Sequence, residues 1–502
     1  MKRITAALLA VLMLVLCLAG CKGEEKKPDA TDKTPTQNDT QNNGAYNEEG
    51  DIKVDLSNAT LDIPEDAFYK DYEFTVFVPY PHGINRFVRK ELNGTPVNDA
   101  MYNRDLALQD QLGVTINAID MSAYTHNQAE YIIDSVLAGD HAFDAAAIHS
   151  TSACAALIVA DAVLSFDYLE YCDLSKPWWI QGFSENCSMF DENYFGISSA
   201  CWAYYQGAGC LLFNKDLANE HDLPDLYELV RKDEWTVDKL ITLTKNFSED
   251  LNGDGIFNEE DKLAIACADF AKMNFWYGAF RQSTVSRGEN DEPQYNVNTP
   301  RIVNVVEKLN TLFHTGRRGA VYVANEEDPI YEEMFIEGRL LFFVATPSTA
   351  TSFREHDINF GIIPLPKFDD NQERYGSWVD PWHLTLCVPI DNEDPERTSV
   401  ILEAMAYHSY RLIYPAIVEQ EVFGSGTRDI ESLEMLEDYI FPNIFFDFGY
   451  IYDGWGQGYS DLLRMLVPKK STDVASFVAQ RKNVAEAHYE ELYDAALNKS
   501  EK

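Results

Sequence analysis

The sequence predicts an α/β protein in which short buried strands alternate with helices. Three features lead to this prediction: an apolar composition, runs of strand-type residues, and helical apolar spacing between these runs. Hydrophobic residues make up 46% of the 502 residues and aromatic residues 13%, which is enough for large cores and too apolar for a disordered chain. Repeated strand–helix–strand order favours mainly parallel sheets joined by right-handed crossovers.

The predicted elements fall into two series along the chain. In the first series, strands at 73–79, 113–120 and 143–150 are separated by helical stretches around 99–112 and 128–137. A second series begins with a strand at 209–216 and continues with strands at 339–346 and 359–365. The C-terminus is predicted to be a helix with its apolar residues on one face, and Ser471 to Asp473 are available as caps.

The chain is strongly acidic, with 40 basic and 82 acidic residues and a formal net charge of −42. Such a surface repels phosphate backbones, so nucleic-acid binding is excluded as a function class. It also disfavours binding to anionic membrane surfaces. A neutral or cationic ligand is the easier partner.

Residues 1–20 have the pattern of a bacterial lipoprotein signal peptide. Lys2 and Arg3 precede an apolar run at 6–18 that is too short for a membrane anchor. The following LAGC sequence at 18–21 resembles a lipobox, in which the new N-terminal Cys21 carries diacylglycerol and an acyl chain such as palmitate. An ordinary signal peptide followed by a chance cysteine is the alternative. We expect the protein on the extracellular face of the cell membrane, held only by the lipid on Cys21.

Residues 21–69 are predicted to be the lipidated cysteine and a disordered tether. The stretch at 22–50 is dominated by polar residues and cannot bury enough apolar area to offset its ordering entropy. Removing residues 1–20 leaves 38 basic against 82 acidic residues, a net charge of −44.

Seven cysteines remain after the anchor, and they show neither a CxxC pair nor a zinc-ligand spacing. Seven is an odd number, so at least one thiol is free. Several of them lie in apolar runs, and buried, inert thiols are therefore expected. They are Cys154, Cys172, Cys187, Cys201, Cys210, Cys267 and Cys387.

Several short motifs occur in a characteristic order and spacing. They are LFNKDL at 212–217, LPD at 223–225, WTVDKL at 235–240, FGIIPLPK at 360–367, and the STD sequence that opens the C-terminal helix. With these motifs, residues 70–502 resemble the extracellular solute-binding proteins of ABC importers, in the branch of carbohydrate-binding lipoproteins of Gram-positive bacteria. One departure is His221-Asp222, where that family often has Gly.

The resemblance implies an α/β, two-lobed, type II periplasmic-binding-protein fold with hinge crossings. Lobe one would comprise 70–204 plus 340–418, and lobe two 207–337 plus 422–502. The crossings would fall near 204–207, 338–340 and 418–421. The ligand would bind between the lobes, at the carboxyl ends of strands.

The same resemblance implies a monomer that delivers a ligand, best matched by an oligosaccharide, to ABC permease subunits. A peptide or polyamine ligand, or a ligand sensor on the same fold, remains the alternative. An enzyme is not expected, because the chain lacks the G-x-S-x-G and H-E-x-x-H motifs and the family carries no catalytic residues.

Sugar rings have apolar faces and polar rims, so their sites need flat aromatic side chains flanked by carboxylates. Trp382 and Trp455 are predicted to be stacking platforms from opposite lobes, with Asp380 accepting hydroxyl hydrogen bonds. Trp455 stands between Gly454 and Gly456, an arrangement that exposes a large ring on a turn. For each single aromatic, packing in the core is the competing interpretation. The further candidates are Trp378, Trp202, Tyr204, Tyr80 and His149.

The segment at 250–261 (DLNGDGIFNEED) matches the calcium loop of the EF-hand at nearly every position. Gly255 permits the sharp turn at the sixth position, and Asp261 closes the loop where Glu is usual, which weakens the site. An acidic Asn/Gly turn without metal is the alternative. A solitary structural Ca²⁺ is predicted, with ligands from Asp250, Asn252, Asp254, the Ile256 carbonyl, Asn258 and Asp261.

Overall fold

The structure is a computed structural model that describes residues 60–79, 83–120, 126–268, 272–315, 319–322, 330–379, 383–418 and 429–500. Four of the residues singled out in the sequence lie outside these ranges: the lipidation candidate Cys21 and the ligand candidates Tyr80, Asp380 and Trp382.

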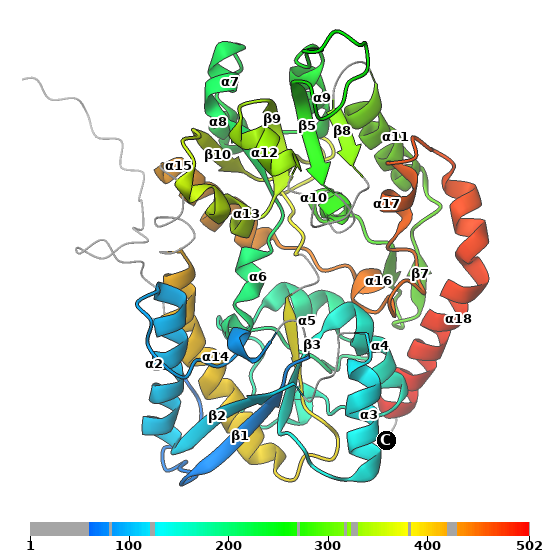
Figure 1. Cartoon of the computed structure of the whole chain (residues 1–502). Helices are drawn as coiled ribbons and strands as arrows, with labels where there is room; N and C mark the ends of the chain where they lie inside the picture. Colours follow the sequence, from blue (N-terminus) through cyan, green and yellow to red (C-terminus); the bar gives the residue numbers. More distant parts are fainter. Residues whose placement is uncertain are drawn as a thin grey trace, which may run out of the picture. The chain divides into compact units, whose positions relative to one another are not determined.

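The first sheet has four strands in the order β11-β3-β1-β2 (Figure 1). Strands β1, β2 and β3 are parallel, and β11 runs antiparallel to β3. The α/β alternation predicted for the first third of the chain is therefore confirmed. The elements of this half are β1 (Tyr72–Phe77), α2 (Pro96–Leu112), β2 (Val114–Ile119), α3 (Gln128–Ala138), β3 (Ala145–His149), α4 (Ser150–Val159), α5 (Gln181–Cys187), β11 (Leu384–Cys387) and α14 (Pro395–Ile417).

The second sheet has five strands in the order β10-β4-β9-β5-β8. Strand β4 is antiparallel to both neighbours, whereas β9, β5 and β8 are parallel to one another. The elements of this half are β4 (Cys210–Asn214), α7 (Lys215–Glu220), α8 (Leu226–Arg231), α9 (Val237–Thr244), β5 (Leu263–Ala268), α10 (Phe275–Ala279), α11 (Pro300–His314), β8 (Gly319–Tyr322), α12 (Ile330–Ile336), β9 (Leu340–Ala345), α13 (Pro347–Ser352) and β10 (Phe360–Ile363). A separate two-stranded sheet pairs β6 (Val285–Arg287) with β7 (Pro293–Tyr295).

The boundary predicted at 338–340 is wrong. Strands β9 and β10 lie in the second sheet, where β9 is paired on one side with β4 and on the other with β5. All six residues of β9 are buried. Such an apolar run fits the centre of either sheet, and only its hydrogen-bonded partners decide which one it joins. The chain returns to the first half between β10 and β11.

The connections between the halves are tied to one another by backbone hydrogen bonds. Helix α6 (Ala203–Gln206) leads into the first connection, as predicted. Ser377 lies in the connection between β10 and β11 and bonds to two other segments. Its amide donates to the Asn443 carbonyl (3.0 Å), and its carbonyl accepts from the Phe445 amide (2.9 Å). Its hydroxyl donates to the Gly209 carbonyl (2.8 Å), so one residue joins all three segments. Most of the third predicted crossing, 418–421, lies outside the described residues.

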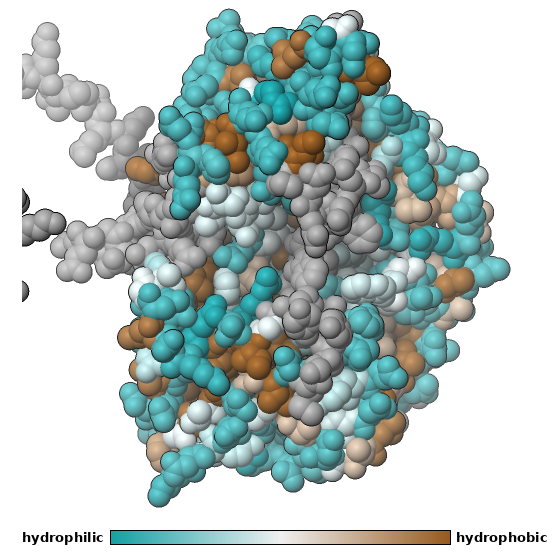
Figure 2. Space-filling view, in the orientation of Figure 1, coloured by the Kyte–Doolittle hydropathy of each residue, from teal (hydrophilic) through white to brown (hydrophobic). Residues whose placement is uncertain are grey.

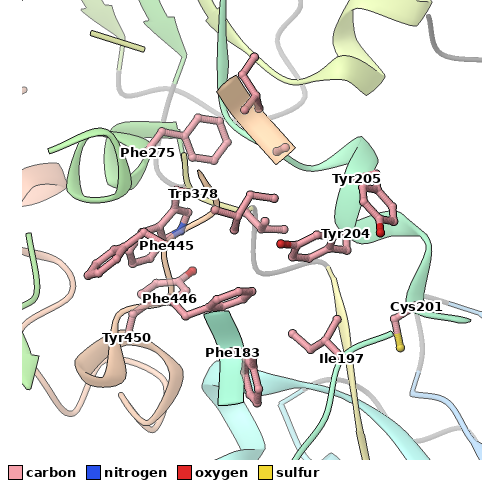
Figure 3. Close-up of a cluster of buried hydrophobic side chains, with 14 of the residues drawn as sticks. Phe183, Ile197, Cys201, Tyr204, Tyr205, Phe275, Trp378, Phe445, Phe446 and Tyr450 are labelled. Carbon is pink, nitrogen blue, oxygen red and sulfur yellow. The ribbon is translucent and has the colours of Figure 1, made fainter. Parts of the chain in front are cut away.

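Aromatic side chains fill the space around these connections (Figure 3). The rings of Trp378 and Tyr450 have centroids 4.7 Å apart, and Tyr204 stacks on Phe446 at 6.0 Å. Beside them the Gly376 backbone approaches that of Gly278 so closely that a Cβ on Gly376 would meet the Gly278 carbonyl oxygen at 2.0 Å. Glycine at 376 therefore permits a close backbone approach.

The C-terminal region contacts both halves, which corrects the assignment of all of 422–502 to lobe two. Helix α18 (Val474–Ser500) packs against α4 of the first half and against β7. At its end, the Lys499 ammonium lies 2.7 Å from the Asp161 carboxylate. The predicted cap is confirmed: Asp473 accepts the Ser476 amide at 3.0 Å. The segment leading to α18 contains α16 (Phe448–Ile451) and α17 (Leu462–Leu466).

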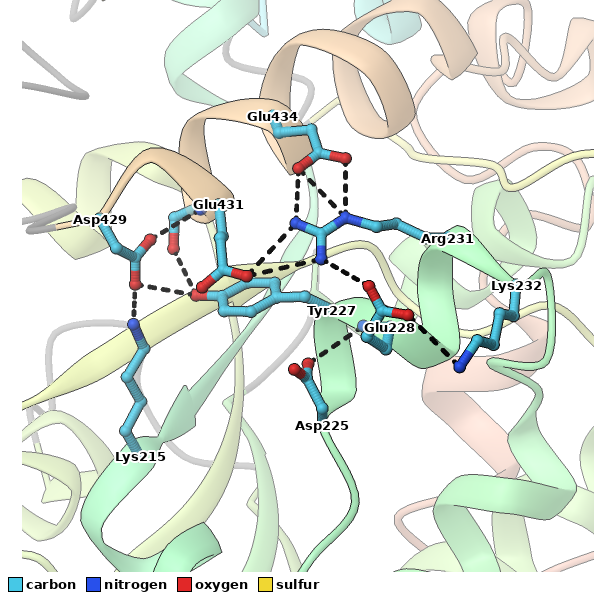
Figure 4. Close-up of polar contacts among 10 residues, drawn as sticks. Lys215, Asp225, Tyr227, Glu228, Arg231, Lys232, Asp429, Glu431 and Glu434 are labelled. Atoms are coloured by element: carbon cyan, nitrogen blue, oxygen red, sulfur yellow. Dashed lines mark hydrogen bonds and ion pairs between the residues drawn. The ribbon is translucent and has the colours of Figure 1, made fainter. Parts of the chain in front are cut away.

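Helix α15 (Ile430–Glu434) is held to the second half by a polar network (Figure 4). Arg231 on α8 makes a two-pronged contact with Glu434, with nitrogen–oxygen distances of 3.0 and 2.6 Å. Asp429 pairs with Lys215 and accepts the Tyr227 hydroxyl. Partly exposed pairs contribute little singly, but the bidentate geometry and shared partners make this network specific.

The predicted tether is shorter than 21–69. Residues 60–69 contact the folded body: Leu61 and Ile63 pack against the core, and the Tyr69 amide donates to the Leu112 carbonyl at 2.6 Å. These apolar side chains follow the polar stretch at 22–50, which gives a physical reason for the folded region to begin before 70.

None of the seven cysteines after Cys21 forms a disulfide, and only Cys172 is not fully buried. Burial raises the pKa of six of these thiols, those of Cys154, Cys172, Cys187, Cys201, Cys210 and Cys387. The expectation of inert thiols is therefore supported. Within the part of the chain that the structure describes, no helix is long and apolar enough to cross a membrane.

Several buried carboxyl groups titrate at unusually high pH. Glu403 accepts the indole N–H groups of Trp178 (2.9 Å) and Trp179 (2.8 Å). Burial raises the pKa of Glu403 to about 7 despite these bonds. Burial also raises the pKa of Asp447 to about 7 and that of Asp453 to about 6. In each case removing the carboxylate from water outweighs the hydrogen bonds that favour its charged form.

These raised pKa values predict that the protein is more stable near pH 5 than near pH 7.5. Between the ordinary carboxyl pKa and about 7, Glu403 and Asp447 bind more protons in the folded state than in the unfolded state, so their contribution to the free energy of unfolding falls as pH rises. His408, whose pKa burial lowers to about 4, acts in the opposite direction between pH 4 and 6.5. Thermal unfolding followed by circular dichroism from pH 5 to 8 measures the slope. Glu403→Gln should flatten it, whereas Glu490→Gln on the exposed side of α18 should not. A midpoint that rises with pH contradicts the prediction.

Candidate ligand-binding site

A pocket of about 370 Å³ lies between the two halves of the protein and is lined by residues of both. This volume is in the range of small-molecule sites. Its walls are polar, with two cations, one carboxylate and several hydroxyl groups. The lining residues are Arg86, Ala203, Gln206, Gly207, Lys272, Glu332, Thr346, Ser348, Thr349, Ser352 and His383.

The pocket lies where open α/β sheets place their binding crevices. Thr346 directly follows β9, and Lys272 follows β5, at the carboxyl ends of two parallel strands of the second sheet. Arg86 follows β1, and His383 directly precedes β11, the antiparallel neighbour of β3. The ends of strands from both sheets therefore meet at one pocket.

Hydroxyl groups line the side of the pocket formed by α13. Thr346 caps this helix by accepting the Thr349 amide (3.3 Å), and Pro347 occupies the first helical position, where no N–H is needed. The hydroxyls of Thr346 and Thr349 lie 3.2 Å apart. The short helix thus presents Thr and Ser side chains to the pocket on a fixed backbone.

The charged residues give the pocket a positive balance, in contrast to the acidic surface. Arg86 and Lys272 face a single carboxyl, Glu332. Burial raises the pKa of Glu332, and the charge of Lys272 acts in the opposite direction. On the face shown in Figure 2, hydrophilic residues cover most of the described surface.

Trp455 is exposed on a tight turn, as the flanking glycines predict. Its side chain is 58% exposed, and its backbone has a φ of 62°, a left-handed value unusual for a large residue. The turn is built on buried Asp453, which accepts the amides of Gly456 and Gly458. The Trp455 amide donates to the Thr151 carbonyl at 3.0 Å and so fastens the turn to α4.

The Trp455 ring lies against His149, with ring centroids 5.4 Å apart. His149 ends β3 and pairs with Leu384, the first residue of β11, which follows the pocket residue His383. Trp455 and His149 are therefore at the same edge of the first sheet as the pocket. The structure brings these two sequence-predicted candidates together.

Three other predicted candidates have structural roles. Trp202 is partly buried, and its indole N–H donates to the Arg86 carbonyl at 2.7 Å, which holds the pocket residue Arg86 in place. Tyr204 and Trp378 are each 2% exposed and belong to the aromatic cluster of Figure 3. For these two, packing in the core, the competing interpretation of the sequence, describes the structure.

The polar lining of the pocket is not among the site residues predicted from the sequence. Thr346, Ser348 and Thr349 directly follow a predicted strand, which is the signal that marks the carboxyl end of a sheet. Because that strand was assigned to the other lobe, this signal was not recognised. Nothing in the sequence marks Lys272 and Glu332 as site residues, since both are ordinary charged residues in an acidic chain.

The predicted calcium loop forms a compact turn at 250–261. Gly255 has a φ of 80°, as the sixth motif position requires. Asp250 accepts the amides of Gly253 (2.6 Å) and Gly255 (2.8 Å), and Asp261 accepts that of Leu251 (2.9 Å). Among the described residues, no group of three or more His, Cys, Asp or Glu side chains is arranged to hold a metal ion. The calcium site stays a prediction.

No protein-family model matches the sequence, and no curated protein matches it either. Solved structures do match. The galacto-N-biose/lacto-N-biose I-binding protein of an ABC transporter from Bifidobacterium longum is 13% identical, with a TM-score of 0.55 over 84% of this chain and 98% of that one. UspC from M. tuberculosis is 13% identical, with a TM-score of 0.54 over 83% and 100%. A cyclo/maltodextrin-binding protein is 12% identical, with a TM-score of 0.52 over 86% and 98%.

The chain has the two-lobed, type II periplasmic-binding-protein fold. At this identity the likeness shows the fold alone, and the fold agrees with the one that the sequence motifs imply. In this fold, lobe one is the half built on the β11-β3-β1-β2 sheet, lobe two is the half built on the other five strands, and the pocket is the inter-lobe site.

Proposed function

We propose that the protein is an extracellular solute-binding lipoprotein that captures an oligosaccharide between its lobes and delivers it to an ABC importer. The observation that carries this proposal is the polar inter-lobe pocket beside an exposed Trp455. Two of the proteins with this fold were solved with sugars: the B. longum protein with lacto-N-biose and the cyclo/maltodextrin-binding protein with maltotetraose.

The residues at the site suit a sugar. An exposed indole packs well on the apolar face of a sugar ring, and the turn that carries Trp455 is fastened to α4 by a backbone hydrogen bond. Threonine and serine hydroxyls, together with Arg86, Lys272 and Glu332, can donate to or accept from sugar hydroxyls. Hydrogen bonds to charged groups are the stronger ones.

The charge of the pocket favours a sugar over a polyamine. The acidic chain as a whole suits a cation, but Arg86 and Lys272 outnumber Glu332 in the pocket. A polyamine would place its ammonium groups beside these cations, which costs free energy. A peptide-binding protein is distinguished from a sugar importer by the ligand that it binds. A ligand sensor on the same fold is distinguished by its partner protein. No residue at the site calls for catalysis, so we propose binding and not an enzymatic reaction.

Trp455→Ala should weaken oligosaccharide binding about tenfold, because it removes a stacking platform. Calorimetric titration with a panel of oligosaccharides, peptides and polyamines measures the affinity. Tyr168→Ala, which removes a ring that is 66% exposed elsewhere, is the matched control. Trp455→Phe should restore part of the affinity. Binding of a peptide or polyamine but no sugar would reject the ligand class, and equal affinity in Trp455→Ala would reject the platform.

Trp382 and Asp380 stay predictions as the opposing platform and the hydroxyl acceptor. Trp382→Ala and Asp380→Asn belong in the same titration, where each should weaken sugar binding without lowering the unfolding midpoint.

We also propose that the loop at 250–261 binds a structural Ca²⁺, supported by its match to the motif and the left-handed Gly255. Binding would require the carboxylates to exchange their backbone amide partners for the ion. With a Kd on the order of 10 μM and about 1 mM calcium, stabilisation would be ~2.7 kcal/mol. Thermal unfolding in EDTA and in excess Ca²⁺ tests this, with Asp254→Ala as the variant. An unchanged midpoint in wild type would end the proposal.

Lipid attachment at Cys21 is the third part of the proposal, supported by the LAGC sequence at 18–21. Cys21→Ala should release the protein into the medium, since a lipid tether requires that thiol. Cell fractionation followed by immunoblotting measures the distribution, and Cys172→Ala, which removes the least buried of the other thiols, should leave it unchanged. A Cys21→Ala protein that stays on membranes after a high-salt wash would contradict a lipid tether.

A further inference from the structure

A second pocket, of about 360 Å³, lies on the other face of α6 from the inter-lobe site. The inter-lobe pocket is lined by Ala203 and Gln206, and the second by Tyr204 and Tyr205, which point to the opposite side of the helix. Because the connections at α6 and at 441–444 line it, we call it the hinge pocket. Its charged lining residues are Arg281, Arg374, Glu185 and Glu437.

Two arginines of lobe two line the hinge pocket without carboxylate partners. Gln372 brings their segments together, because its side-chain amide donates to the carbonyls of Ala279 (2.7 Å) and Arg374 (2.9 Å). Neither Arg281 nor Arg374 forms an ion pair with a described residue. Among the described residues, Arg89 and Arg411 also form no ion pair. Eight other arginines of the described chain do form such pairs: Arg104, Arg231, Arg287, Arg301, Arg339, Arg397, Arg464 and Arg481.

The burial and the backbone conformation of Arg281 both cost free energy. One of its terminal nitrogens, Nη1, is buried without a hydrogen-bond partner, and its backbone has a φ of 48° in the left-handed region. Its guanidinium carbon lies 5.1 Å from the centroid of the Phe445 ring, which fixes its place beside the hinge. Burial, followed by repulsion from Arg374, lowers the pKa of Arg281 to about 10, and Glu185 acts in the opposite direction. The cost of burying Arg281 and its repulsion from Arg374 are both offset when an anion binds between the two guanidinium groups.

The two carboxyl groups of the hinge pocket, Glu185 and Glu437, repel an anion only weakly. Glu185 is exposed to solvent, which screens its charge. Burial and the neighbouring Asp438 raise the pKa of Glu437 to about 7, so this group is partly protonated at neutral pH.

We propose that the hinge pocket binds a small oxyanion, of the phosphate, sulfate or carboxylate type, between the guanidinium groups of Arg281 and Arg374. The planar fork of each guanidinium matches two oxygens of such an anion. The pocket is separate from the sugar site, so this proposal does not depend on the identity of the transported ligand.

Calorimetric titration of the purified protein with sodium phosphate and sodium sulfate tests the proposal, with chloride at equal ionic strength as the reference. Saturable binding to wild type is expected. Arg281→Gln and Arg374→Gln should each weaken it tenfold or more, the loss expected for a charge-assisted hydrogen bond. Because Arg374 is exposed, its variant folds even if the Arg281 variant is unstable. Glu437→Gln should strengthen binding, which a purely structural role for the arginines would not produce.

Arg301→Gln is the matched control. Its guanidinium carbon also packs over a phenylalanine, 3.6 Å from the centroid of the Phe368 ring, but outside the hinge pocket. Phosphate affinity should be unchanged in this variant. Absence of saturable phosphate or sulfate binding to wild type would overturn the proposal, and so would equal affinity in wild type and Arg374→Gln.

Discussion

The pairing of three chain segments at the hinge is the constraint on which the rest of the architecture depends. Ser377 contacts all three: its backbone joins the segment at 443–445, and its hydroxyl reaches Gly209. Through these bonds the segment between β10 and β11, the residue before β4 and the segment at 443–445 share one place in the fold. The close approach of Gly376 to Gly278 leaves no space for a side chain there. The aromatic cluster of Figure 3 then packs around a backbone whose course is already set.

This constraint places two pockets on opposite faces of α6. On one face, the ends of strands from both sheets supply the polar lining of the inter-lobe site, and the Trp455 turn lies along the same edge through His149. On the other face, Arg281 and Arg374 line the hinge pocket. In a chain with net charge −42, cations gather where the halves meet, while the acidic residues dominate the surface. The charge of the whole protein is therefore a poor guide to the charge of its sites.

The secondary structure was predictable because local rules decide it. Strands β1 to β4, β9 and β10 lie within two residues of the predicted ranges, and the cap at Asp473 precedes the C-terminal helix as expected. Sheet membership was less predictable. The buried run of β9 satisfies the hydrophobic pattern of a central strand in either sheet, and only its pairing with β4 and β5 decides between them. Because β9 was assigned to the wrong lobe, the second crossing was predicted at the wrong place and the α13 hydroxyls were not predicted as site residues.

The sequence by itself determined the α/β class, the positions of most strands and the exposed Trp455, because turn chemistry and hydrophobic runs act over a few residues. Only the tertiary structure decided which of the further aromatic candidates are buried. Trp378 and Tyr204 are candidates in the sequence beside Trp455, yet Trp378 and Tyr204 are 2% exposed and Trp455 is 58% exposed. Burial of a ring depends on neighbours such as Tyr450 and Phe446 that are far away along the chain. Only the fold brings Arg281 and Arg374 into one pocket, since they are 93 positions apart in the sequence.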